Sequence, residues 1–127
     1  MSHTILLVED EEQQRFALRL LFESEGYSVL DAESAEDAYE HLKKESPTVV
    51  VTDVKLTGMD GITFFEDVRK DPRFQRIPFV FITGYNDPAA ISELEKLDSV
   101  AYVTKPYNLD DLLKVVRRFA PSDSKPQ

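Results

Sequence analysis

The sequence contains no cysteine and only two histidines among its 127 residues. The absence of cysteine excludes disulfides, thiolate zinc sites and a cysteine nucleophile. The two histidines, His3 and His41, lie far apart along the chain, which disfavours a histidine-based metal centre. No basic segment precedes the first apolar run, and that run is far shorter than a signal sequence or a membrane span. We therefore expect a soluble chain with no membrane contact and a cytoplasmic location.

Basic residues are also in short supply. The chain has 15 Lys and Arg against 24 Asp and Glu, which gives a net charge of −9. A negative field of this size repels the phosphates of nucleic acids, so we expect no nucleic-acid binding by this chain. The length suits one domain with its own core. We assign the domain to residues 1–120, because residues 121–127 are polar and unpatterned and are expected to form a flexible tail or linker stump.

Two hydrophobic periods alternate along the chain. Continuous apolar runs predict buried strands at 5–8, 28–30, 48–52, 78–82 and 100–103. After each run, apolar residues recur at helical spacing, in the sets Phe16, Ala17, Leu20 and Leu21; Ala35, Ala38, Tyr39 and Leu42; Ile62, Phe65 and Val68; residues 88–97; and Leu109, Leu112, Leu113 and Val116. Ser34 and Asn108 are the expected N-caps of the second and last helices. Strand and helix alternate five times, which predicts an α/β fold whose parallel sheet is covered on both faces.

Charged and hydroxyl side chains follow four of the predicted strands. Glu9 and Asp10 come after the first strand, and Asp53 comes after the third. Thr83 and Lys105 follow the fourth and the fifth. Because ligands of open parallel sheets bind beyond the carboxyl ends of the strands, we expect these five side chains to meet at one edge.

Three carboxylates that meet in this way repel one another unless a cation joins them. Lys105 offsets part of the charge, and Mg²⁺, which prefers oxygen ligands and phosphate, would offset more. The cluster therefore predicts a phosphate-handling site with a carboxylate nucleophile. Taken singly, each residue also has a structural explanation, since acidic residues favour a helix N-terminus and a threonine suits a strand end. Their convergence favours the functional interpretation.

Several motifs in order resemble the receiver domain of two-component response regulators. They are Leu-Leu-Val-Glu-Asp-Glu at 6–11, Asp53 with Leu56 and Gly-Met-Asp-Gly at 58–61, Phe-Ile-Thr-Gly at 81–84, and Tyr-Val-Thr-Lys-Pro at 102–106. The resemblance covers about residues 3–120. It implies a flavodoxin-like (βα)5 fold, a doubly wound sheet of five parallel strands in the order 2-1-3-4-5 within three α/β/α layers. It also implies a phosphorylation-dependent switch rather than a conventional turnover enzyme.

The resemblance further implies a role for each site residue. Asp53 would be the phosphoacceptor, Lys105 the phosphoryl-binding ammonium and Thr83 the switch hydroxyl. Mg²⁺ would be held by Glu9, Asp10, Asp53 and the backbone carbonyl of Lys55. Tyr102 would be the switch aromatic, Lys55 and Tyr85 would tune the phosphoryl lifetime, and a cis peptide bond would join Lys105 to Pro106.

The implied partners are other proteins. A histidine kinase or a histidine phosphotransfer protein would supply the phosphoryl group. The signal would leave through a face made by helix 88–97, strand 100–104 and helix 108–119. A downstream protein, a fused output domain or a second copy in a phosphorylation-dependent homodimer would read that face.

Four positions depart from the family pattern. Glu9 stands where aspartate is more usual, and its longer arm could reach a metal through water. Thr57 stands where proline is often found. Asp98 and Ser99 replace the usual Gly-Ala pair before the last strand, which leaves the geometry of that loop open.

Three other functions fit parts of the pattern. A flavodoxin-like electron carrier shares the strand order, but the acidic run at 9–12 would repel a flavin phosphate. A small Mg²⁺-dependent aspartyl phosphatase of the haloacid-dehalogenase type needs a second aspartate two residues after its nucleophile, where this chain has Lys55. A degenerate receiver that acts as a phosphorylation-independent binding module would not need Asp53, Thr83 and Lys105 together.

Overall fold

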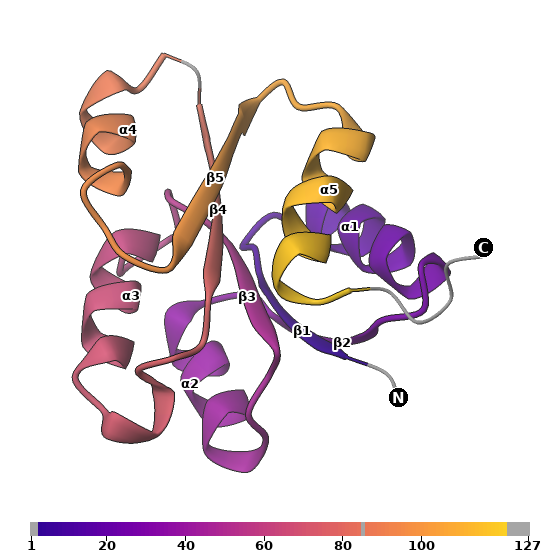
Figure 1. Cartoon of the computed structure of the whole chain (residues 1–127), viewed down its shortest axis with the longest axis horizontal. Coiled ribbons are helices and arrows are strands. Elements are labelled where there is room, and N and C mark those ends of the chain that lie inside the picture. The colour runs from indigo at the N-terminus through magenta and orange to yellow at the C-terminus, as the bar shows by residue number, and fades with distance from the viewer. Residues whose placement is uncertain (1–2, 85, 122–127) are drawn as a thin grey trace.

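The computed structural model describes residues 3–84 and 86–121, which form one parallel sheet flanked by helices (Figure 1). The strands are β1 (Thr4–Val8), β2 (Ser28–Ala32), β3 (Val49–Asp53), β4 (Phe79–Gly84) and β5 (Val100–Lys105). The helices are α1 (Glu12–Ser24), α2 (Ala35–Lys44), α3 (Gly61–Arg69), α4 (Pro88–Leu94) and α5 (Leu109–Phe119), with a short 3₁₀ helix at Pro72–Phe74. The strand order is β2-β1-β3-β4-β5, as expected.

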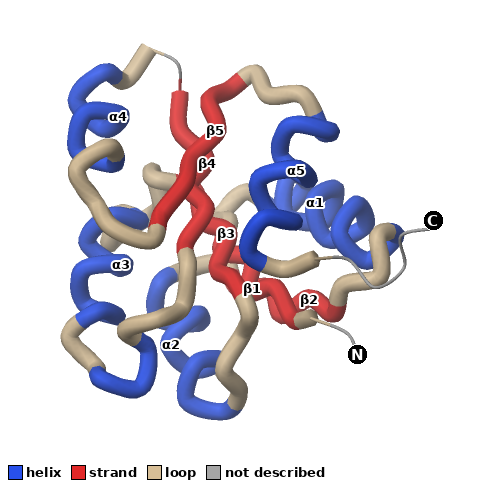
Figure 2. Tube along the Cα trace, in the orientation of Figure 1, coloured by secondary structure: helices blue, strands red, loops and turns tan. Residues whose placement is uncertain are grey.

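The helices form two layers, one on each side of the sheet. Helices α1 and α5 cover one face, and α2, α3 and α4 cover the other (Figure 2). Each face has its own hydrophobic core, because successive residues of a strand point to opposite sides. Along β1, Ile5 and Leu7 pack into the core under α1 and α5, whereas Leu6 and Val8 pack into the core under the other three helices. The doubly wound α/β/α fold is therefore confirmed.

Side-chain caps fix where several helices begin. The hydroxyl of Ser34 accepts a hydrogen bond from the Asp37 N–H at 3.1 Å, and Asn108 accepts one from the Asp110 N–H at 2.7 Å. Both caps were predicted. Asp60 caps α3 in the same way, by accepting a hydrogen bond from the Thr63 N–H. Because these caps lie at the ends of loops that follow strands, they help to fix the loops that carry the polar residues.

The hydrophobic spacing identified the buried face of α1 only in part. Leu18 and Phe22 are buried against the sheet and Leu21 packs partly against the same core, whereas Phe16 is 62% exposed and Leu20 is 50% exposed. In the last helix, Leu109 is also exposed, although Leu112, Leu113 and Val116 are buried as expected. An isolated helix period cannot tell which of two apolar stripes faces the sheet.

Several boundaries also differ from the expected ones. Strands β3, β4 and β5 continue through Asp53, Gly84 and Lys105, so the polar residues lie on the last strand positions. Helix α4 ends at Leu94, three residues before the expected end. Tyr85 and most of the expected tail lie outside the described residues. Within the part of the chain that the structure describes, no helix is both long and apolar enough to span a membrane.

Candidate functional site

A cleft of about 570 Å³ opens at the carboxyl ends of β1, β3, β4 and β5. Its walls include the five side chains that the sequence placed at this edge, and its full lining is Glu9, Asp10, Glu11, Asp53, Val54, Lys55, Thr83, Gly84, Asn86, Asp87 and Lys105. The parallel register explains the convergence: Asp53 of β3 pairs with Ile82 of β4, and Thr83 and Gly84 pair with Thr104 and Lys105 of β5.

The carboxylate of Asp53 and the ammonium of Lys105 form an ion pair in this cleft. Lys105 Nζ donates a hydrogen bond to Asp53 Oδ2 at 3.1 Å, with the Asp53 side chain only 9% exposed. Partial burial alone would lower the pKa of the Lys105 ammonium. The hydrogen bond to Asp53 and the charges of Asp53 and Glu9 outweigh that effect and raise the pKa. Lys105 therefore stays cationic beside a nearly buried carboxylate.

Glu9 is a buried acid with incomplete partners. Its side chain is 2% exposed, and one carboxylate oxygen accepts a hydrogen bond from the Glu11 N–H at 3.1 Å. Among the described residues, its other oxygen, Oε1, has no hydrogen-bond partner. Burial, with a further contribution from the negative charge of Asp53, raises the pKa of Glu9 to about 7. The protein groups around Glu9 therefore do not by themselves stabilise its ionised form.

Asp10 is held by the loop that follows β3. Asp10 Oδ2 accepts two hydrogen bonds from Thr57, one from the backbone N–H at 2.9 Å and one from the hydroxyl at 2.7 Å. The hydrogen bond from the Thr57 hydroxyl is the main reason that the pKa of Asp10 is lowered. Asp10 is therefore ionised and oriented, in contrast to its neighbour Glu9.

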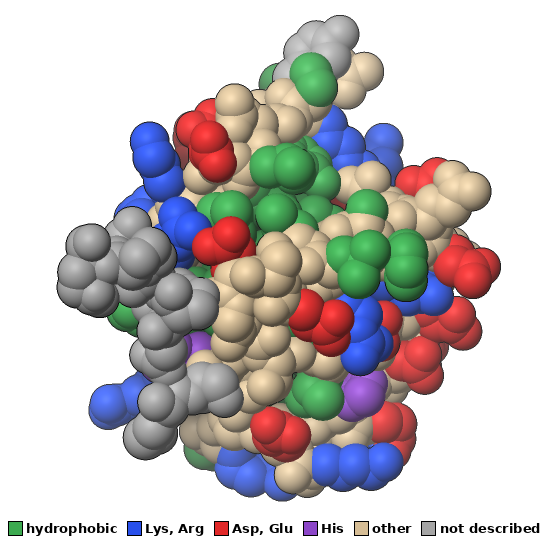
Figure 3. Space-filling model, turned by 90° about the vertical axis from the view of Figure 1, so that its right-hand side faces the viewer, with side chains coloured by type: hydrophobic (Ala, Val, Ile, Leu, Met, Phe, Trp, Pro, Cys, Tyr) green, Lys and Arg blue, Asp and Glu red, His purple; other side chains and the backbone are tan. Residues whose placement is uncertain are grey.

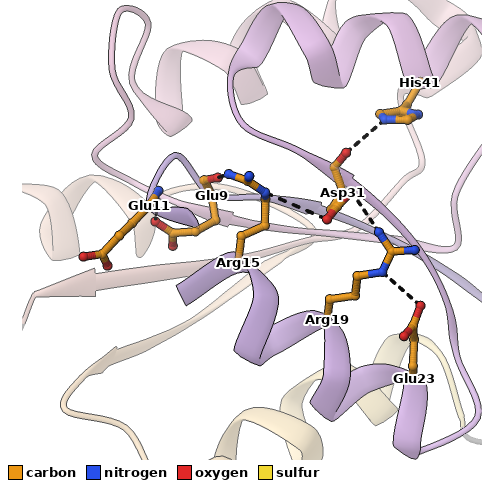
Figure 4. A network of polar contacts seen from close by, with 7 residues as sticks. All are labelled: Glu9, Glu11, Arg15, Arg19, Glu23, Asp31 and His41. Carbon is orange, nitrogen blue, oxygen red and sulfur yellow. Dashed lines mark hydrogen bonds and ion pairs between the residues drawn. The ribbon is translucent and has the colours of Figure 1, made fainter. Parts of the chain in front are cut away.

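A network of polar contacts from α1 and β2 supports the β1–α1 loop. Arg15 donates a hydrogen bond to the backbone carbonyl of Glu9 at 2.9 Å and lies 3.8 Å from the carboxylate of Asp31 (Figure 4). Arg19 bridges Asp31 and Glu23 at 3.1 and 3.0 Å. The contact from Arg15 fixes the backbone at the residue that begins the acidic pair.

Gly61 allows the start of α3 to lie against the backbone of Asp53. A Cβ atom at this position would lie 2.3 Å from the backbone oxygen of Asp53, so a larger residue does not fit without movement of that backbone. The Gly61 N–H also donates a hydrogen bond to the carbonyl of Val54 at 2.7 Å. The glycine thus sets the backbone beside the central carboxylate.

The remaining predicted residues lie around the cleft or near it. Thr83 is buried in the cleft wall, and Lys55 is exposed at its edge. Tyr102 of β5 pairs with Phe81 of β4, and the Tyr102 hydroxyl donates a hydrogen bond to Glu95 at 2.8 Å. This places the Tyr102 ring outside the cleft. The Lys105–Pro106 peptide bond is cis, as the resemblance implies.

The protein oxygens suit a magnesium ion that completes its shell with other ligands. Among the described residues, no group of three or more His, Asp or Glu side chains is arranged to hold a metal. Mg²⁺ needs only one or two carboxylates when water and phosphate complete the octahedron. The unpartnered buried oxygen of Glu9 and the oriented carboxylate of Asp10 provide hard oxygen donors of the required kind. The residues present therefore fit this ion.

Some supporting residues were not predicted from the sequence. Thr57 stands out in the sequence only as a departure from the family pattern, and nothing in the sequence marks Arg15, because neither residue lies at a strand end. Gln14 and Tyr107 form a hydrogen bond of 2.8 Å between α1 and the loop after β5, although 93 residues separate them. Only the tertiary structure brings such pairs together.

Comparisons with known proteins agree with this architecture. Residues 5–117 match the family model described as the response regulator receiver domain. The sporulation initiation phosphotransferase F of Bacillus subtilis (strain 168) is 29% identical over 98% of this chain and 98% of its own length. The transcriptional regulatory protein AfsQ1 of Streptomyces coelicolor is 35% identical over 95% of this chain. The chain spans about half the length of AfsQ1 and of several other relatives.

A solved structure shows the same fold. The receiver domain of the sensor histidine kinase PA1611 from Pseudomonas aeruginosa PAO1 superposes with a TM-score of 0.82 over 94% of this chain and 98% of its own, at 22% identity. That structure has a magnesium ion coordinated in its active site cleft. The strand order, the residues at the carboxyl edge and the family match agree, and the chain belongs to the response regulator receiver domain family.

Proposed function

We propose that this chain is a phosphorylation-controlled switch in which Asp53 accepts a phosphoryl group. The observation that carries the proposal is the 3.1 Å contact between Lys105 Nζ and Asp53 Oδ2 in a cleft lined by further acids. An Asp53 oxygen attacks the phosphorus of a phosphohistidine, an O–P bond forms and the P–N bond breaks. The electron pair of that bond stays on the histidine nitrogen, and Asp53 becomes an acyl phosphate.

The other residues of the cleft have defined tasks in this scheme. Lys105 neutralises charge on the transferred phosphoryl group, and the Thr83 hydroxyl donates a hydrogen bond to one of its oxygens. Asp10, Asp53 and the Lys55 carbonyl would hold Mg²⁺, with Glu9 reaching it through water, and the ion would supply further compensation for phosphoryl charge. Lys55 stands two residues after Asp53 and, while protonated, cannot act as the acid–base group of a phosphatase. We therefore propose a phosphoacceptor rather than a turnover enzyme; Lys55 and Tyr85 are the proposed tuning residues.

The donor is proposed to be a histidine kinase or a histidine phosphotransfer protein in the cytoplasm. Helix α1 begins directly after the acidic residues at the edge of the cleft, so a protein bound over the cleft can also contact this helix. On this helix, Phe16 and Leu20 are exposed rather than packed on the sheet. Figure 3 views the side of the molecule that carries α1 and α5, where hydrophobic side chains reach the surface. We assign this apolar stripe of α1 to contact with the donor protein.

The signal is proposed to pass through Thr83 and Tyr102. When Thr83 turns toward a phosphoryl oxygen, it vacates space beside β4 into which the Tyr102 ring can move. That movement breaks the hydrogen bond from Tyr102 to Glu95 and reshapes the face formed by α4, β5 and α5. A downstream protein, a fused output domain or a second copy would read this face. Perturbations of amide shifts by beryllofluoride that stay within the residues lining the cleft, and leave α4, Tyr102 and α5 unmoved, would contradict this route.

The phosphoacceptor is tested with acetyl phosphate and Mg²⁺. The intact chain is expected to gain the mass of one phosphoryl group, and Asp53→Asn is expected to gain none. Asp98→Asn, which changes an exposed aspartate away from the cleft, is the matched control and should label like the unaltered chain. Full labelling of Asp53→Asn would refute the assignment, and no labelling of the unaltered chain would favour a phosphorylation-independent binding module.

A further inference from the structure

We infer that Thr57 is a positioning residue for the metal ligand Asp10, an inference that rests on the proposed Mg²⁺ site. Thr57 lies in the loop between β3 and α3, and Asp10 lies in the loop after β1. The backbone N–H and the hydroxyl of Thr57 both donate hydrogen bonds to Asp10 Oδ2, at 2.9 and 2.7 Å. The two loops are thus joined at the rim of the cleft by a bidentate contact across 47 residues of sequence.

The arrangement leaves the two carboxylate oxygens of Asp10 with different tasks. Oδ2 accepts both hydrogen bonds from Thr57, so its lone pairs are engaged. Oδ1 is the oxygen that remains for a cation. Two contacts on one oxygen also restrict rotation of an otherwise exposed side chain, and a ligand held in place loses less rotational freedom when an ion binds.

Few residue types could make this contact. Proline has neither an N–H nor a hydroxyl, so it provides neither donor. Alanine or valine would keep the N–H and lose the stronger, shorter hydrogen bond. Only serine and threonine combine the backbone donor with a hydroxyl that reaches the same oxygen. The identity of residue 57 therefore sets how firmly Asp10 is oriented before the ion arrives.

The size of the effect follows from which donors a variant removes. Loss of an outer partner of a metal ligand typically costs about 10- to 100-fold in metal affinity. Thr57→Val removes one donor of two, and we expect Mg²⁺ affinity to fall by about three- to tenfold, the square root of that range. Thr57→Pro removes both donors, so its Mg²⁺ affinity should fall further. Thr57→Ser keeps both and should bind Mg²⁺ like the unaltered chain.

The test is a titration of the unphosphorylated chain with MgCl₂, followed by backbone amide shifts at residues 9–11 and 53–58. Thr63→Val is the matched control, because Thr63 is exposed on α3 and uses its backbone N–H rather than its hydroxyl to contact Asp60. Thermal unfolding in chelator checks that each variant is folded. As a second measurement, the Mg²⁺ concentration that half-saturates acetyl phosphate labelling should rise by the same factor in Thr57→Val.

The outcomes separate this inference from the proposed function. An affinity order of Ser equal to Thr, then Val, then Pro supports the positioning role. If the unaltered chain binds Mg²⁺ and Thr57→Val binds it equally or more tightly, the inference is overturned, because Thr57 would then be a bystander or a competitor of the ion. If MgCl₂ shifts no amide of the unaltered chain and Asp10→Ala leaves acetyl phosphate labelling unchanged, the metal site of the proposed function is itself wrong.

Discussion

Glu9→Gln should make the protein more stable, and increasingly so as the pH rises. The Glu9 side chain is 2% exposed and has a pKa of about 7, against an ordinary value of 4.5. The folded chain therefore binds this proton more tightly than the unfolded chain does. The stability that the protonated acid contributes is complete below about pH 4.5 and is lost as the pH rises to about 7.

The magnitude follows from the two pKa values. The two pKa values differ by about 2.5, and each pKa unit corresponds to about 1.36 kcal/mol. The protein therefore loses about 3 kcal/mol of stability above pH 7. Glutamine has the same shape, carries no charge and keeps an oxygen that accepts the hydrogen bond from the Glu11 N–H. Between pH 5 and pH 8, the stability advantage of Glu9→Gln should therefore grow by roughly 2.5 kcal/mol.

Urea unfolding followed by far-ultraviolet circular dichroism, in chelator at pH 5, 6, 7 and 8, measures this difference. Glu93→Gln, which changes an exposed acid on α4, is the control and should track the unaltered chain at every pH. Adding Mg²⁺ at pH 8 should stabilise the unaltered chain more than Glu9→Gln, because the ion offsets the charge of Glu9. Parallel stability curves for the unaltered chain and Glu9→Gln would refute the reasoning, since they would mean that Glu9 titrates as it does in water.

Three further outcomes follow from local geometry. Gly61→Ala should lose about 1–3 kcal/mol of stability in urea unfolding, because its Cβ would lie 2.3 Å from the Asp53 backbone oxygen; an unchanged midpoint would contradict this. Ser99→Gly should gain about 0.5–1 kcal/mol, because Ser99 has a φ of +62° in the left-handed region that glycine adopts readily, and a loss of stability would count against it. Phe16→Ala should slow phosphorylation by a phosphohistidine donor protein and leave labelling by acetyl phosphate unchanged. Its stability should differ by less than about 0.5 kcal/mol, because Phe16 is exposed. Equal slowing with both donors would contradict the assignment of α1 to donor contact.

The loop before β5 illustrates a question that the sequence left open. The pair Asp98 and Ser99 replaces the small residues usual in the family, and no local rule gave the resulting backbone. In the structure, Ser99 adopts a positive φ and the Phe79 N–H still donates a hydrogen bond to its carbonyl. The loop therefore keeps a glycine-like conformation without glycine, because the pairing of β4 with β5 constrains it.

The sequence alone determined the α/β class and the edge at which the site lies. Continuous β-branched and aliphatic runs can be satisfied only by buried strands, and parallel strands bring their carboxyl ends to one side. The sequence therefore assigns five side chains to one rim, and all five line the cleft: Glu9, Asp10, Asp53, Thr83 and Lys105.

Only the tertiary structure decided which helix faces are buried and how the acids differ. Phe16 and Leu18 are equally apolar in the sequence, yet the sheet covers Leu18 and leaves Phe16 in solvent. Glu9 and Asp10 are adjacent acids, yet burial raises the pKa of Glu9, while the hydrogen bond from the Thr57 hydroxyl lowers that of Asp10. The physical reason is common to both cases: burial and hydrogen bonding depend on residues distant in sequence, which come together only when the chain folds.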